Sequence, residues 1–125
     1  MTLKFSVLAG QFAVCQLPAD ADIPPWAYSG ALFSVSRSAD ELSVVCAAER
    51  APEGVKHERP WICLKLAGPF PFQMTGVLAS FLAPLADANV PIFAVSTYDT
   101  DYVLIKQSDE QRALAALTSA GHELL

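Results

Sequence analysis

The sequence has few basic residues and no long apolar run. Only 8 of its 125 residues are Lys or Arg, against 13 Asp and Glu, and its net charge is −5. Binding to nucleic-acid phosphates needs clustered Lys and Arg, so this composition argues against a nucleic-acid or anionic-membrane surface. No uninterrupted apolar stretch reaches the roughly 18 residues of a membrane-spanning helix, so no membrane span is expected.

Cysteine is also scarce, and no catalytic signature is present. Cys15, Cys46 and Cys63 do not have the spacing of metal ligands, and a sparse, odd count fits a reducing cytoplasm. His57 and His122 have no Cys or Asp partner at a recognisable spacing. The chain lacks a Gly-rich phosphate loop, a nucleophile elbow and a paired-carboxylate site. We therefore expect a cytoplasmic protein that is not an enzyme and uses no metal or cofactor.

Apolar residues, in contrast, are abundant. The hydrophobic share is 53% and the charged share 17%, whereas an average globular domain has about 25% charged residues. A small protein with this much apolar surface often buries part of it against another chain. The composition therefore favours an oligomer, and a symmetric homodimer is the expected form.

The first half of the chain reads as short strands without a long helix. Apolar and polar residues alternate over residues 3–7, and residues 12–17, 31–36 and 42–47 are further short apolar segments separated by turns and loops, which predicts four strands. Residues 49–58 contain Pro52, Gly54 and several charged residues, so we expect a connector there. This connector is the predicted boundary between a first domain, residues 1–58, and a second, residues 59–125.

The second half alternates between strand and helix patterns. A strand at residues 61–66 is followed by apolar residues at helical spacing from Val77, with Thr75 as the expected N-cap and Pro84 as a source of bending. Residues 91–106 predict a hairpin, in which two apolar runs flank a polar turn.

The remaining residues complete the order expected for a known arrangement. Ser108 to Gln111 fits a capping box, Gly121 closes the helix that follows, and residues 122–125 return as a strand. The predicted order βαββαβ indicates an α+β, ferredoxin-like fold, with both helices on one face of an antiparallel sheet.

An internal repeat links the two halves. Residues 31–45 align without a gap to residues 91–105 at an offset of 60, which places Glu41 opposite Asp101. Duplication explains this match and predicts two tandem halves, the first of them degenerate because it lacks a long helix. Chance similarity between two hairpins is the alternative.

Several motifs together resemble the ACT domain family. The helix opening Thr75-Gly76-Val77 and the segment Ile92 to Ile105, with its Ser-Thr-Tyr-Asp-Thr-Asp core, are similar to those of tandem-ACT proteins related to the cytosolic arginine sensor. The resemblance covers nearly the whole chain. It implies a non-catalytic regulatory or sensor protein that binds an amino acid or similar small molecule at an interface between ACT units.

The resemblance also implies which residues contact the ligand. These are Thr75, Gly76, Val77, Ser96, Thr97 and Asp101. The N–H groups at a helix N-terminus suit a carboxylate, and Gly76 allows a ligand close to the backbone. Asp101, with a neighbouring hydroxyl, could hold an ammonium group or a cationic side chain.

Each of these residues also has a purely structural interpretation. Thr75 could simply cap its helix, and Asp101 could cap the hairpin turn. An interaction module that dimerises or binds a partner enzyme without any ligand is therefore a second hypothesis. A small ferredoxin-like enzyme is a third, although only Asp99, Asp101 and nearby hydroxyls could serve it.

Overall fold

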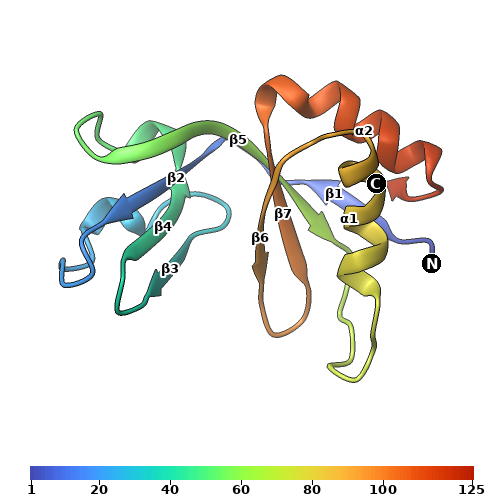
Figure 1. Ribbon diagram of the computed structural model, residues 1–125, viewed down its shortest axis with the longest axis horizontal. Helices are drawn as coiled ribbons and strands as arrows, with labels where there is room; N and C mark the ends of the chain where they lie inside the picture. Colours follow the sequence, from blue (N-terminus) through green and yellow to red (C-terminus); the bar gives the residue numbers. More distant parts are fainter. The chain divides into compact units, whose positions relative to one another are not determined.

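The computed structural model describes residues 1–125 and divides the chain into two units. The α+β unit comprises residues 1–8 and 62–125, and the β unit comprises residues 9–61. Strand β5 (Lys56–Leu66) runs through the division (Figure 1). The units differ from the predicted ranges 1–58 and 59–125 because the chain's first strand pairs with the end of β5.

The β unit is an antiparallel sheet in the order β3–β4–β2–β5. Its strands besides β5 are β2 (Phe12–Leu17), β3 (Ser34–Arg37) and β4 (Leu42–Ala47). All three were predicted, although β3 starts three residues later than expected. This is the strand order of a ferredoxin-like sheet, formed without the helices.

One face of the β unit carries its core. Alternate residues of β2 and β4, including Cys15, Val44 and Cys46, are buried there. Two single 3₁₀ turns, η1 (Pro25–Ala27) and η2 (Ala48–Arg50), take the place of long helices. The expected absence of a long helix from the first half is therefore confirmed.

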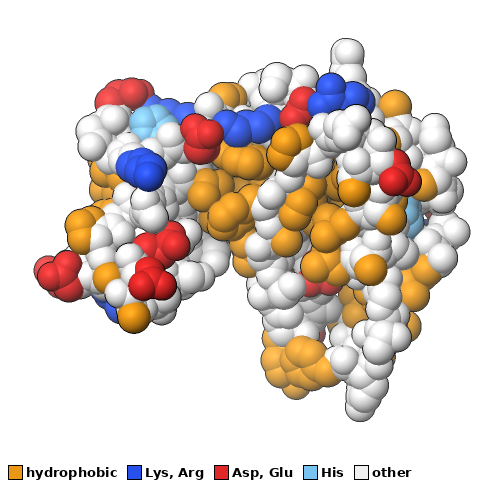
Figure 2. Space-filling view, in the orientation of Figure 1, with side chains coloured by type: hydrophobic (Ala, Val, Ile, Leu, Met, Phe, Trp, Pro, Cys, Tyr) orange, Lys and Arg blue, Asp and Glu red, His pale blue; other side chains and the backbone are white.

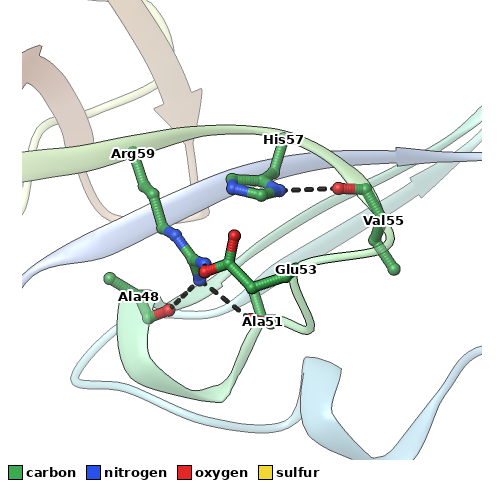
Figure 3. A network of polar contacts seen from close by, with 6 residues as sticks. All are labelled: Ala48, Ala51, Glu53, Val55, His57 and Arg59. Carbon is green, nitrogen blue, oxygen red and sulfur yellow. Dashed lines mark hydrogen bonds and ion pairs between the residues drawn. The ribbon is translucent and has the colours of Figure 1, made fainter.

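The predicted connector is an ordered segment held by Arg59. Its Nη1 donates to the carbonyl oxygens of Ala48 and Ala51, both at 2.8 Å, and its Nη2 pairs with the Glu53 carboxylate (Figure 3). Because Glu53 is largely exposed, the ion pair contributes little stability and the two carbonyl contacts do most of the holding. The Arg59 guanidinium is thus hydrogen-bonded to groups of the same chain.

The α+β unit has a five-strand sheet in the order β6–β7–β5–β1–β8. Its elements besides β5 are β1 (Lys4–Val7), α1 (Val77–Asp87), β6 (Ile92–Ser96), β7 (Asp101–Lys106), the 3₁₀ turn η3 (Gln107–Asp109), α2 (Glu110–Ser119) and β8 (Glu123–Leu124). Neither helix has the length and apolar character needed to span a membrane.

The last strand of the predicted βαββαβ order is not where a ferredoxin-like sheet would have it. Strand β1 lies antiparallel beside β5, and β8 pairs only with the outer edge of β1, in parallel. Burial explains why β1, and not β8, pairs with β5, because β1 buries Phe5 completely whereas both residues of β8 are exposed. The chain's N-terminus therefore supplies the strand that was expected from residues 122–125.

Both helices cover the same face of this sheet, as predicted. Val77, Phe81 and Leu85 of α1 join Ala113 and Leu117 of α2 in one core cluster with residues of β1, β5 and β7. The rings of Phe5 and Phe81 meet edge to face, with centroids 5.3 Å apart. The helical spacing of the apolar residues therefore identified the buried faces correctly.

The predicted N-caps of both helices are wrong, whereas Gly121 lies just after α2 in the left-handed conformation that ends a helix, as expected. Gly76, with φ of 81°, occupies the N-cap position of α1 and provides no side chain, while Thr75 lies outside and is exposed. Helix α2 begins after η3, with Asp109 at its N-cap and no capping hydrogen bond from a side chain, so the Ser108–Gln111 capping box does not form. A left-handed Gly76 turns the backbone away from the geometry in which Thr75 could cap the helix.

The buried His122 compensates for Pro84. Proline has no N–H, so the carbonyl of Ser80, four residues earlier, loses its donor within α1. The Nε2 of His122 lies 3.0 Å from that carbonyl oxygen, while the N–H of Leu3 donates to Nδ1 at 3.1 Å. Nδ1 is therefore the acceptor, Nε2 carries the proton, and the imidazole is neutral. His122, for which the sequence shows no recognisable partner, thus links Leu3, the residue before β1, to α1.

The two hairpins of the repeat match at an offset of 59, not 60. The last paired residues before the turn are Arg37 and Leu42 in one hairpin and Ser96 and Asp101 in the other. An offset of 59 superposes core residues on core residues, for example Val44 on Val103. Because a one-residue shift moves every side chain to the opposite face, the predicted pairing of Glu41 with Asp101 is wrong.

Candidate functional site

The candidate site surrounds the turn between β6 and β7, residues 97–100. The backbone N–H of Thr97 donates to the carbonyl oxygen of Thr100 at 2.9 Å, and the Thr97 hydroxyl donates to the same oxygen at 3.2 Å. At the base of the turn, the Ser96 hydroxyl donates to the carboxylate of Asp101. The polar residues predicted to grip a ligand are thus held by one another.

The turn is also fastened to the loop that follows β5. The buried hydroxyl of Thr100 donates to the carbonyl oxygen of Leu66, and the N–H of Phe70 donates to that of Asp99, both at 2.8 Å. Gly68 makes this close approach possible, because a Cβ there would lie 2.8 Å from the Asp99 carbonyl oxygen. The turn and the loop are therefore held together as one continuous surface.

Two cavities open beside this turn, both within the α+β unit. The first, which we call the aromatic cavity, has a volume of about 230 Å³ and is lined by Phe70, Pro71, Phe72, Met74, Val77, Ser96, Thr97, Tyr98, Asp99, Thr100 and Asp101. The second, the lysine cavity, has a volume of about 440 Å³ and is lined by Ser6, Lys65, Ala67, Gly68, Pro69, Thr97, Tyr98, Asp99, Thr100 and Tyr102.

The aromatic cavity brings together most of the predicted site residues. Val77, Ser96, Thr97 and Asp101 line it, from the start of α1 and from both strands of the hairpin. Thr75 and Gly76 do not line it and lie exposed just before the helix.

The charges of the aromatic cavity are all negative. Asp99 and Asp101 are its only ionisable side chains besides the phenol of Tyr98. Asp101 is half-buried and uses one oxygen for the Ser96 hydroxyl, which leaves the other available to a cation. Val77, the first residue of α1, also lines the cavity, and α1 begins without a side-chain cap, so the N–H groups of its first turn remain available to an anion.

An exposed aromatic pair borders the same cavity. Phe72 and Tyr98 meet edge to face with ring centroids 4.7 Å apart, although 72% of Phe72 and 80% of Tyr98 is exposed. Figure 2 shows hydrophobic side chains gathered at the tip of the β6–β7 hairpin. Solvent-exposed rings in contact are a typical lining for a bound molecule or a partner surface. Tyr98 does not stand out in the sequence, because a tyrosine in a polar turn gives no sign of its contact with Phe72.

Cys15 and Cys63 offer no nucleophile, whereas hydrogen bonding with Cys15 lowers the pKa of Cys46, whose side chain is fully buried. All three are buried and free. Burial raises the pKa of Cys63 to about 12, and hydrogen bonding to Cys46, with burial, raises the pKa of Cys15. Because the thiolate is the reactive form, Cys15 and Cys63 remain inert thiols at neutral pH.

Comparison with known families assigns the larger part of the chain. The sequence profile of the ACT domain matches residues 56–119, slightly more than half of the chain. The chain belongs to the ACT domain family. A second profile, described only as an N-terminal domain, matches residues 10–54. The ACT profile thus covers both helices and the hairpin, and the second profile covers most of the β unit.

Related proteins and structures agree with this assignment. A segment of 39 residues is 46% identical to the human protein CASTOR3P, covering 31% of this chain and 24% of that protein. The crystal structure of protein Atu0741 from Agrobacterium tumefaciens superposes with a TM-score of 0.93 at 39% identity, over 100% of this chain and 93% of that one. The regulatory subunit of aspartate kinase from Thermus flavus shares the fold, with a TM-score of 0.59 at 13% identity over 96% and 97% of the two chains.

Proposed function

We propose that this ACT protein is a non-catalytic regulatory sensor that binds an amino acid or similar small molecule in the aromatic cavity. The observation that carries the proposal is the convergence of Val77, Ser96, Thr97 and Asp101 on one cavity. The class of ligand is inferred from the resemblance to amino-acid-binding ACT proteins and from the chemistry of the residues that line the cavity. An interface with a second ACT unit, a homodimer and a cytoplasmic location remain predictions from the sequence.

The lining suits a molecule with a cation at one end and a carboxylate at the other. The cation would contact the free oxygen of Asp101, because the cavity has no Lys or Arg to repel it. The carboxylate would face the uncapped start of α1 at Val77. The apolar part of the ligand would pack on Phe72 and Tyr98, whose exposed rings gain burial on binding.

The aspartate kinase regulatory subunits support a regulatory role by analogy of fold. These subunits share the fold of this chain and are the regulatory subunits of an enzyme. Fold analogy alone does not identify a ligand, so the proposal relies on the cavity.

Thermal unfolding in the presence of each of the twenty amino acids tests the proposal. At a hundredfold excess over its dissociation constant, a ligand stabilises the folded state by about 2.7 kcal/mol, which raises the melting temperature by several degrees. Asp101→Asn should lose most of this shift because it removes the charge that faces the ligand cation. Asp22→Asn, at an exposed site in the β unit, is the matched control and should keep it. A panel in which no amino acid raises the melting temperature would refute the proposal.

A dimerising interaction module is the second candidate, and the exposed aromatic pair is the observation that favours it. If Phe72 and Tyr98 bind a second copy, light scattering should show a dimer for the native chain and a monomer for Tyr98→Ser. In that case amino acids would leave the melting temperature unchanged. A monomeric native chain stabilised by an amino acid would eliminate this candidate.

A further inference from the structure

The lysine cavity lies on the sheet face opposite the helices of the α+β unit. Ser6 of β1 is the cross-strand partner of Lys65 in β5. Their neighbours Phe5 and Leu66 belong to the helix-covered core, so side-chain alternation places Ser6 and Lys65 on the other face. At about 440 Å³ the cavity has the size of a small-molecule site.

Lys65 enters this cavity without a carboxylate partner. No Asp or Glu oxygen lies within 4 Å of its ammonium group, which lies over the Tyr102 ring, 6.0 Å from the nitrogen to the ring centroid. Arg59 and Arg112, in contrast, each have an acidic partner. A half-buried ammonium beside the hydroxyl of Ser6 is a suitable contact for a carboxylate.

The opposite charge borders the same cavity. Asp99, at the tip of the hairpin turn, is the only acidic residue in its lining. Its backbone carbonyl is fixed by the N–H of Phe70, while its side chain is exposed. One cation and one anion around a single cavity match a small zwitterion, whereas a polyanion such as phosphate would meet repulsion from Asp99.

We propose that the lysine cavity is a second binding site, which takes a free amino acid with its carboxylate on Lys65 and Ser6 and its ammonium group on Asp99. This site is separate from the aromatic cavity, because Ser6, Lys65 and Tyr102 line only the lysine cavity. Only the turn, residues 97–100, borders both cavities, so the effect of a ligand on the turn residues does not show which cavity it occupies.

Nuclear magnetic resonance of the isotopically labelled full chain can separate the two sites. Each of the twenty amino acids is titrated to millimolar concentration while the backbone resonances of Ser6, Lys65 and Tyr102 are followed. At least one amino acid should shift them, and Lys65→Gln should weaken that binding about tenfold or more, as expected for the loss of a charge-assisted hydrogen bond. Lys65→Arg, which keeps the charge, should retain it.

Two controls test whether binding depends on Lys65 in particular and on both charges of the amino acid. Lys4→Gln removes an exposed lysine on the same sheet face that does not line the cavity, and it should leave the affinity unchanged. Propionate lacks the amino group of alanine, and ethylamine lacks its carboxylate, so both should bind more weakly than alanine. Inorganic phosphate should not bind.

The inference and the proposed function fail in different ways. If amino acids shift Val77 and Ser96 but never Ser6 and Lys65, the second site is refuted while the proposed function stands. If shifts at Ser6 persist unchanged in Lys65→Gln, the assignment of the carboxylate is wrong and the inference is overturned. If no amino acid shifts either group of resonances, both proposals fail.

Discussion

At the residue scale, His122 shows how a side chain acquires a role from a distant proline. Pro84 and His122 are 38 positions apart in the sequence, and neither suggests the other. In the fold, the imidazole donates to the Ser80 carbonyl that Pro84 leaves without a helical donor. The buried N–H of Leu3 depends on the same ring. Two backbone groups would therefore lose their partner if the imidazole were removed.

This dependence predicts a non-additive pair of substitutions. His122→Ala should lower the free energy of unfolding by about 2–4 kcal/mol, because it leaves two buried backbone groups unpaired. In a Pro84→Ala background the loss should be smaller, since the restored N–H at position 84 can bond Ser80. Urea denaturation of the four proteins gives the coupling energy directly. Strict additivity would show that the two residues are not linked.

Asp101 illustrates a proposed site residue for which one line of support was wrong. The repeat matched Asp101 with the acidic Glu41, and the registers of the two hairpins exclude this match. The structure supports Asp101 differently, since it is half-buried, accepts the Ser96 hydroxyl and lines the aromatic cavity. Lys65 was not singled out because alternation alone places a lysine on the solvent side of its strand.

At the element scale, the hairpin turn, residues 97–100, and the loop after β5 are held in tight backbone contact. Gly68 allows their backbones to touch, and a side chain there would collide with the Asp99 carbonyl oxygen and with Cβ of Thr100. Gly68→Ala should therefore lower the free energy of unfolding by about 1–3 kcal/mol. It should also weaken ligand binding, because both cavities share this turn.

Gly54 offers a matched control for this substitution. No atom lies within 4 Å of a Cβ built there, and its φ does not require glycine. Gly54→Ala should be neutral or stabilise by up to about 1 kcal/mol through the unfolded chain. Chemical denaturation and an amino-acid titration measure both effects, and equal stability of the two alanine variants would show that the turn and loop are not in tight contact.

The elements themselves were largely predictable, whereas their ends and partners were not. Hydrophobic periodicity located α1 and α2 and the hairpin strands, because those residues bury one face each. The cap at Thr75 failed because the left-handed Gly76 comes between Thr75 and the helix. Residues 122–125 do form a short strand, β8, but it pairs with β1 and not with β5, because β1 competes for that position and no local pattern reports the competition.

At the scale of the whole molecule, the first residues of the chain complete the unit formed by the last ones. Phe5 is fully buried against Phe81 in the core of the α+β unit. Phe5→Ala should lower the free energy of unfolding by about 3–5 kcal/mol. Hydrogen exchange should show the loss of protection mainly in α1 and β7, which share the core with Phe5, and less in β3 and β4.

Val7→Ala is the matched control on the same strand. Val7 is 39% exposed, so its truncation should cost little and should leave the exchange pattern unchanged. If Phe5→Ala instead removed protection chiefly from β3 and β4, the assignment of residues 1–8 to the α+β unit would be contradicted.

The proposed function places a bound amino acid in the aromatic cavity of the α+β unit. The most direct measurement is a crystal structure of the full chain with the amino acid that most raises its melting temperature. We expect the ligand's cationic group within hydrogen-bond distance of Asp101, its carboxylate at the backbone N–H groups that begin α1, and its side chain against Phe72 and Tyr98. A ligand bound at any other place, with the aromatic cavity empty, would contradict the account.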